Sequence, residues 1–364
     1  MKIKEVITQL ERLAPPQLQE SYDNAGLIVG DSNSDLTKAL ICLDSTEEII
    51  DEAIENGCNL VIAHHPIVFS GLKRFNGKNY IERTVIKAIK NDIAIYAIHT
   101  NLDNVYNGVN HKIGEKLGLQ NMRILSPKSK LLRKLVFYCP TEHAEEVRQK
   151  VFETGAGEIG NYSFCSFSML GTGTFMANEN AKPFAGEANQ LHAEQEERIE
   201  VVYPSYCQSE VVSALLNKHP YEEVAYDLYQ IENTWNQIGS GMLGEFAEEL
   251  TIEQFLKHLK NSLNAPMVRY TKPVSTKIKK VAVCGGSGSF LLNNAIRAKA
   301  DVFVTADFKY HQFFDADSKI VIADIGHFES EQFTGELIQE YLQEKIPNFA
   351  SYLTKIRTNP INYI

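Results

Sequence analysis

Apolar residues in the first third of the chain follow two periodicities in turn. Short runs that are apolar at nearly every position, as expected of strands buried on both faces, cover 39–43, 59–63 and 93–98. Between them, apolar positions recur at helical spacing over 47–56 and 80–90, and an earlier helical pattern covers 2–14. Because strands and helices alternate at this spacing, the pattern predicts βαβ units and a parallel sheet.

The pattern changes near Pro127. Four predicted strands, at 135–139, 164–170, 199–203 and 224–229, are interleaved with helical patterns at 142–154 and 208–217. This β-α-β-β-α-β order is that of a ferredoxin-like fold. After Trp235 the earlier alternation resumes, with buried strands at 278–284, 301–305 and 320–324. The sequence therefore predicts a discontinuous, parallel-sheet α/β core domain from 1–127 and 237–364, with an inserted ferredoxin-like α+β domain at 128–236.

Length and composition agree with a two-domain globular protein. The 364 residues exceed one ordinary core, and 44% are hydrophobic and 23% charged. No apolar run approaches the roughly 20 residues that span a bilayer, and the N-terminus lacks a signal-peptide core. The six cysteines form no CxxC pair, which favours reduced thiols in a cytoplasmic protein. A net charge of −10 argues against broad nucleic-acid binding but leaves room for a local basic pocket that binds an anion.

Two adjacent histidines stand where the strand 59–63 ends. His64 and His65 are followed by Pro66, which ends the regular backbone. The carboxyl ends of buried parallel strands are where α/β proteins hold ligands and metals. Neighbouring side chains diverge on a strand, so two adjacent imidazoles suit two metal ions better than one. The alternative is a pair of partly exposed loop histidines.

Two further strands end in polar residues of the same kind. The strand 93–98 leads to Asp103, and the strand 320–324 leads to His327 and Glu331. If a helix begins near His327, Glu331 lies one turn later on the same face, where both can approach one metal ion or a close pair. A helix N-terminus also attracts acidic residues through its dipole, and we prefer that explanation for Glu329. Three imidazoles and two carboxylates suit two divalent ions bridged by a carboxylate; the five candidates are His64, His65, Asp103, His327 and Glu331.

A glycine-rich turn follows the strand 278–284. Its sequence, Gly285-Gly286-Ser287-Gly288-Ser289, can hold an anion against a helix N-terminus. It lacks both the P-loop Lys-Ser/Thr and the spacing of a dinucleotide fingerprint. Tight packing between helix and strand explains the glycines equally well.

Four motifs together carry a family resemblance: Asp23-Asn24-Ala25-Gly26-Leu27, Ala63-His64-His65-Pro66, His99-Thr100-Asn101-Leu102-Asp103 and Gly326-His327-Phe328-Glu329-Ser330-Glu331. The chain resembles, over its whole length, the GTP cyclohydrolase 1 type 2 homologue family, also called NGG-interacting-factor-like dinuclear metal-centre proteins. Residues 128–236 resemble the PII- and CutA-like insert of its longer bacterial members. The resemblance implies a toroidal homohexamer with a two-metal site, held by the same five residues, lining an internal cavity. It also implies that His99 and His311 support the ligands or contact the substrate.

The resemblance implies a hydrolase acting on GTP. In that reaction a hydroxide formed at the two metals attacks C8 of guanine, opens the ring and releases formate. The residues alone indicate only metal-assisted hydrolysis, and they fit a phosphoester or amide substrate equally well. Lys73, Arg74 and Lys309 are the nearest basic candidates for binding a triphosphate, although each fits a solvated surface charge as well.

The alternative is a non-catalytic hexamer that acts as a regulator or scaffold. In that case the metals are structural or sensory, and the insert recognises a metabolite or a partner protein. An enzyme needs an open coordination position, whereas a structural site is closed by protein ligands. Imidazoles and carboxylates suit zinc, iron, manganese or nickel, so the two divalent ions are not identified by their ligands.

Overall fold

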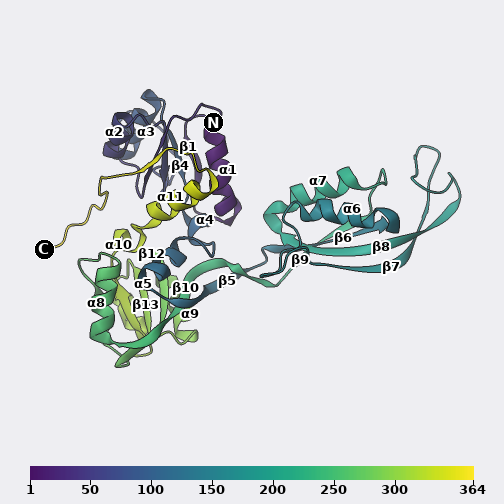
Figure 1. Cartoon of the computed structure of the whole chain (residues 1–364). Coiled ribbons are helices and arrows are strands. Elements are labelled where there is room, and N and C mark those ends of the chain that lie inside the picture. The colour runs from purple at the N-terminus through teal and green to yellow at the C-terminus, as the bar shows by residue number, and fades with distance from the viewer. The chain divides into compact units, whose positions relative to one another are not determined.

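The computed structural model describes residues 1–364 and divides the chain into two units (Figure 1). The first unit comprises Met1–Ser126 and Gln237–Ile364, and the second comprises Pro127–Asn236. No helix in the chain combines the length and the apolar character that crossing a membrane requires. All six cysteines are free.

The first unit contains a five-stranded sheet in the order β1-β4-β3-β2-β15. Its strands are β1 (Gly26–Val29), β2 (Ala39–Cys42), β3 (Leu60–Ala63), β4 (Ala94–Ala97) and β15 (Ser351–Leu353). The strands β15, β2, β3 and β4 are parallel, and β1 pairs with β4 in the antiparallel sense. Every residue of β2, β3 and β4 is buried, as their unbroken apolar runs predict.

Helices cover this sheet. These helices are α1 (Ile3–Leu13), α2 (Glu47–Glu55), α3 (Tyr80–Lys90) and α11 (Thr334–Lys345). The side chains of α2 and α3 form one apolar cluster with alternate residues of β2, β3 and β4, while α11 contacts both α1 and β2. Thr46 caps α2 by accepting a hydrogen bond from the Ile49 N–H, which confirms the helix start expected there.

A second, six-stranded sheet completes the first unit, in the order β11-β14-β13-β12-β10-β5. Its strands are β5 (Gln120–Ser129), β10 (Thr234–Thr251), β11 (Arg269–Tyr270), β12 (Lys277–Ser287), β13 (Val302–Ala306) and β14 (Val321–Asp324). The central strands β12, β13 and β14 are parallel, whereas β10 and β11 pair with them in the antiparallel sense. Its helices are α5 (Val109–Leu117), α8 (Ile252–Ser262) and α9 (Leu292–Arg297).

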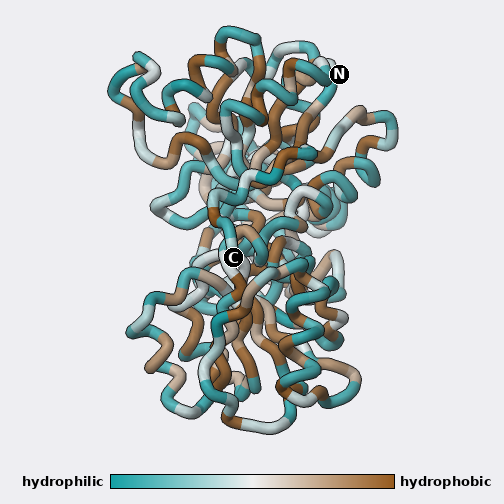
Figure 2. The backbone as a smooth tube through the Cα atoms, turned by 90° about the vertical axis from the view of Figure 1, so that its left-hand side faces the viewer, coloured by the Kyte–Doolittle hydropathy of each residue, from teal (hydrophilic) through white to brown (hydrophobic).

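The α/β class predicted for the core is confirmed, but its strands form two mixed sheets. Hydrophobic periodicity reports the burial of each strand and not its neighbour, so the division into two sheets and the antiparallel edges were not foreseen. In Figure 2 the hydrophobic stretches, coloured brown, run mainly along the central strands, and the hydrophilic colour predominates in the outer loops.

The second unit has the element order β-α-β-β-α-β. Its elements are β6 (Leu132–Pro140), α6 (Thr141–Phe152), β7 (Ser166–Met176), β8 (Leu191–Pro204), α7 (Gln208–Lys218) and β9 (Tyr226–Ile231). The sheet order is β7-β8-β6-β9, and every pair of neighbours is antiparallel. One face packs against both helices in a separate apolar core. The likeness of this unit to PII and CutA domains remains a prediction.

Candidate metal centre

The ends of parallel strands from both sheets of the first unit deliver the candidate ligands. His64 and His65 follow β3, and their N–H groups donate to carbonyls at the end of β2, which extends the ladder past the strand. Asp103 ends the short helix α4 (Thr100–Asp103) after β4. From the second sheet, β14 leads into the short helix α10 (His327–Glu331), which begins and ends with a candidate ligand as the sequence predicts.

These five side chains meet around the carboxylate of Glu331. Its Oε2 lies 3.0 Å from His65 Nε2, 3.1 Å from His327 Nε2 and 3.9 Å from His64 Nε2. His64 Nε2 is also 3.7 Å from Asp103 Oδ1. Three overlapping groups can each hold a metal ion: His64-His65-His99, His65-His327-Glu331 and His64-Asp103-Glu331. Because Glu331 belongs to two of them, its carboxylate is placed to be shared.

Two buried atoms of the cluster have no hydrogen-bond partner. They are His64 Nε2 and Asp103 Oδ1, which face each other. His64 Nδ1 lies 2.8 Å from the carbonyl of Ile98 and donates to it, so Nε2 carries a lone pair. Two buried polar atoms without a partner are costly, and a cation between them removes that cost. The residues present therefore fit a metal ion.

A carboxylate orients each of three imidazoles from behind. His65 Nδ1 lies 2.7 Å from Asp44, and His327 Nδ1 lies 2.6 Å from Asp307. Such a partner fixes the tautomer, so that Nε2 points into the cluster, and it makes the imidazole a stronger metal ligand. We did not predict Asp44 or Asp307. In the sequence, the only signal at each of them is a carboxylate just past the end of a strand.

His99 is the third oriented imidazole. Its Nδ1 lies 2.7 Å from Asp23, whose carboxylate also accepts hydrogen bonds from the N–H and the hydroxyl of Thr100. The His99 ring centroid lies 5.3 Å from the centroids of both His64 and His65. The structure thus brings His99 into the cluster as a sixth candidate ligand, beyond the supporting role that the resemblance implies.

The glycine turn after β12 makes room for Glu331. A Cβ added to Gly286 would lie 2.4 Å from Glu331 Oε1 and 3.1 Å from His327 Cε1. Gly286 also has a φ of +58°, a conformation that a side chain disfavours. Of the two explanations that the sequence left open, close packing applies here, and what packs against the turn is the candidate ligand itself.

Charges within the cluster are arranged around one carboxylate. Burial lowers the pKa of His64 to about 3. Burial opposes protonation of His65, but its hydrogen bonds with Asp44 and Glu331 raise its pKa to about 10. For His327 the carboxylates of Glu331 and Asp307 likewise outweigh burial and raise the pKa to about 11. Protons on His65 and His327 therefore occupy the role that cations would take.

The C-terminal segment braces the cluster from outside. Thr358 Oγ1 donates to Asp44 Oδ2 at 2.6 Å, so the tail holds the carboxylate that orients His65. Asn359 and Arg357 donate to the buried carboxylate of Glu329, at 2.9 and 3.2 Å. Glu329 thus lies in the first turn of α10 but makes its contacts with the tail.

The remaining predicted residues lie outside the cluster. His311 is exposed and its ring contacts those of Tyr310 and Phe314, in the 3-10 helix η4 (Tyr310–Ala316). Lys73 and Arg74 are exposed in the loop between β3 and α3, and Lys309 is exposed just before η4. None of these four side chains is brought together with the candidate ligands.

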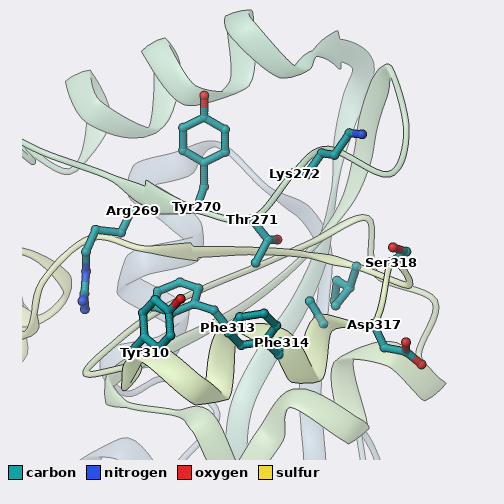
Figure 3. Close-up of a pocket in the computed structure, with 11 residues that line it drawn as sticks. Arg269, Tyr270, Thr271, Lys272, Tyr310, Phe313, Phe314, Asp317 and Ser318 are labelled. Atoms are coloured by element: carbon teal, nitrogen blue, oxygen red, sulfur yellow. The ribbon is translucent and has the colours of Figure 1, made fainter.

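A pocket of about 520 Å³ lies between η4 and the residues of β11 (Figure 3). Tyr310, Phe313 and Phe314 line it from η4, and Arg269 and Thr271 line it from the facing segment. The Arg269 guanidinium pairs with Asp324 and lies 5.4 Å from the centre of the Phe313 ring. No residue of the metal cluster lines this pocket.

Fold and site together define an α/β protein with a cluster of oriented histidines and carboxylates that can hold a metal. The chain belongs to the Duf34/NIF3 (NGG1p interacting factor 3) family, whose model matches residues 1–360. The family expected from the four motifs is thus confirmed.

Relatives and solved structures agree over the full length. A protein of Halalkalibacterium halodurans named GTP cyclohydrolase 1 type 2 homolog is 38% identical, covering 99% of this chain and 98% of the relative. A Bacillus subtilis protein of the same name is 36% identical, with the same coverage. The crystal structure of a Bacillus cereus protein related to NIF3 is 40% identical and superposes with a TM-score of 0.87, covering 100% of this chain and 99% of that one.

Proposed function

We propose that the protein is a metal-dependent hydrolase whose cluster holds two divalent ions. The observation that carries the proposal is the graded exposure of the cluster. The side chains of His64 and Glu331 are 0% and 4% exposed, whereas those of Asp103 and His327 are 26% and 38% exposed. A site that protein closes on one side and leaves open on the other suits catalysis better than a purely structural role.

The protein residues divide naturally between two subsites. His65 and His327 would hold one ion, His64 and Asp103 would hold the other, and Glu331 would bridge them. Two ions bound here would polarise a substrate oxygen and lower the pKa of a water so that it can attack at neutral pH. Zinc, iron, manganese and nickel all suit this ligand set.

His99 contributes proton chemistry beside the two subsites. The pKa of Asp23 is lowered to about 2, since hydrogen bonds from His99 and Thr100 outweigh its burial. Asp23 is therefore a carboxylate that fixes the His99 Nδ1–H and leaves Nε2 to accept a proton from an attacking water or to bind an ion.

GTP is the first substrate to test, because the curated relatives carry the name GTP cyclohydrolase 1 type 2 homolog. Phosphoesters and amides fit the residues equally well and complete the panel. Protein loaded in turn with each metal is assayed for formate release from GTP and for hydrolysis of the other substrates, and its metal content is measured by elemental analysis.

A matched pair of histidine variants tests the assignment. His64→Ala removes a buried candidate ligand, and His311→Ala removes an exposed imidazole outside the cluster. We expect about two ions per chain, with hydrolysis lost in folded His64→Ala and retained in His311→Ala. Metal-loaded protein that is inert toward the whole panel would refute the hydrolase and leave a structural or regulatory metal site.

A further inference from the structure

A row of aromatic rings leads from the surface to the candidate ligands. Tyr22 and Phe69 are 64% and 49% exposed, and their ring centroids are 6.2 Å apart. The Phe69 ring lies edge-on to His99 at 6.3 Å. His99 in turn contacts the rings of both His64 and His65. The row therefore ends within the metal cluster.

The two exposed rings stand on backbone that is held in place. Tyr22 precedes Asp23, whose carboxylate is bound by His99 and Thr100. Phe69 follows Val68, whose carbonyl accepts a hydrogen bond of 2.6 Å from the Asn24 side chain. That bond ties the two loops together, so the rings are positioned before any ligand arrives, which reduces the entropy cost of binding. Large exposed apolar groups beside a polar site indicate a binding surface.

Two positive charges follow Phe69 along its loop. Lys73 and Arg74 are exposed, and neither forms a salt bridge or hydrogen bond with another residue of the chain. Unpaired cations on the loop that carries Phe69 complement a ligand that combines a planar ring with an anionic group. A ligand with an anion alone would leave the exposed rings without a role.

We propose that Tyr22 and Phe69 form a stacking platform for the heteroaromatic ring of a phosphate-bearing ligand at the mouth of the metal centre. The inference rests on the proposed hydrolase function, whose substrate class it specifies. The platform holds the ring, while the ligand's reacting bond faces His99 and the metal ligands. Lys73 and Arg74 attract its phosphate.

Two probes that differ only in the ring test the platform. Binding of guanosine 5′-monophosphate and of ribose 5-phosphate to the metal-loaded full chain is measured by calorimetry. Since aromatic stacking on a base is worth a factor of about 5 to 150 in affinity, we expect the nucleotide to bind tighter by that factor. Phe69→Leu and Tyr22→Leu should lower this ratio at least about fivefold without changing the affinity for ribose 5-phosphate.

Two control variants separate stacking from general damage. Phe69→Tyr keeps the ring and should keep the ratio. Phe75→Leu removes another exposed ring of the same loop, one outside the row, and should behave as the unmodified protein. Equal binding of both probes, binding of neither, or an unchanged ratio in both leucine variants overturns the platform. So does a change of oligomeric state in those variants, because it assigns the rings to an interface between copies.

The platform and the hydrolase can fail separately. Discrimination between the two probes without turnover of any substrate refutes the hydrolase and leaves the platform standing. Turnover of a substrate that lacks a ring, together with no discrimination between the probes, refutes the platform alone. Metal content is measured in every variant, and a leucine variant that loses metal counts against the platform, because its rings then serve the ligands.

Discussion

Substituting Gly286 by alanine perturbs the metal centre at a single, well-defined point. The added Cβ would lie 2.4 Å from Glu331 Oε1, about 1 Å closer than the 3.4 Å at which ordinary contact begins. The Glu331 carboxylate would have to move by a similar distance. Metal–ligand distances tolerate shifts of only about 0.2 Å, so a carboxylate that bridges two ions, as proposed, could not move this far with the ions in their original positions.

The stability cost has two parts. Holding alanine at the Gly286 φ of +58° costs about 1–2 kcal/mol, and overpacking against Glu331 and His327 adds about 1–3 kcal/mol. The free energy of unfolding should therefore fall by about 2–5 kcal/mol. Metal affinity should fall more than the roughly 10- to 100-fold that follows loss of a residue behind a ligand, because here a ligand itself is displaced.

A second glycine supplies the matched control. Gly118, at the end of α5, has a φ of +73° but nothing within 4 Å of an added Cβ. Gly118→Ala therefore measures the backbone cost alone, and its metal content should equal that of the unmodified protein. Urea unfolding gives the stability of both variants, and elemental analysis after dialysis gives their metal content. If Gly286→Ala binds metal normally and loses no more stability than Gly118→Ala, the close approach to Glu331 is wrong.

Three further predictions concern the groups behind the ligands. Asp307→Asn should weaken metal binding about 10- to 100-fold, because it removes the carboxylate partner of His327. Competition with a chromophoric chelator measures the affinity, and an unchanged value would contradict the role of that carboxylate. Thr358→Val should weaken binding less than Asp44→Asn does, because it frees the orienting carboxylate without removing it; equal losses in the same assay would contradict this order. Metal binding at pH 8 should release protons from His65 and His327, whose pKa values are raised to about 10 and about 11. Because these protons compete with metal for the two imidazoles, metal affinity should rise with pH up to those values. Calorimetry in buffers of different ionisation enthalpy measures the protons released, and finding none would refute the prediction.

The candidate ligands were predictable because each lies shortly after a strand buried on both faces. An unbroken apolar run identifies such a strand without knowledge of its neighbours, and polar residues directly after it mark the edge of the sheet. His64 and His65 directly follow β3, whereas Asp103 lies beyond the end of β4, as the last residue of the short helix α4. The spacing of His327 and Glu331 needed only the assumption of a helix, which the structure bears out.

What the sequence could not predict depends on contacts between distant segments. Asp44 carries the same signal whether it begins a helix or orients His65, and only the position of the imidazole separates the two roles. Thr358 is separated from Asp44 by 314 positions of sequence, and no hydrophobic pattern predicts their hydrogen bond. The contact between Tyr22 and Phe69 could not be predicted either, because the sequence of a turn that contains an aromatic residue does not show whether a second ring lies beside it.

His65 and His327 each pair with Glu331, but two other contacts of the cluster are unfavourable without a cation. His65 Nε2 and His327 Nε2 are 3.4 Å apart, so the protons that neutralise Glu331 also repel each other. His64 Nε2 and Asp103 Oδ1 lie 3.7 Å apart, and both are buried without a hydrogen-bond partner. Neither of these two unfavourable contacts can bring the two sheets together. The apolar cores that contain β2–β4 and β12–β14 must therefore hold the strand ends in place. A fold that holds unpaired ligand atoms in one place at a cost in stability is preorganised for metal ions, which would convert the repulsions into coordination bonds.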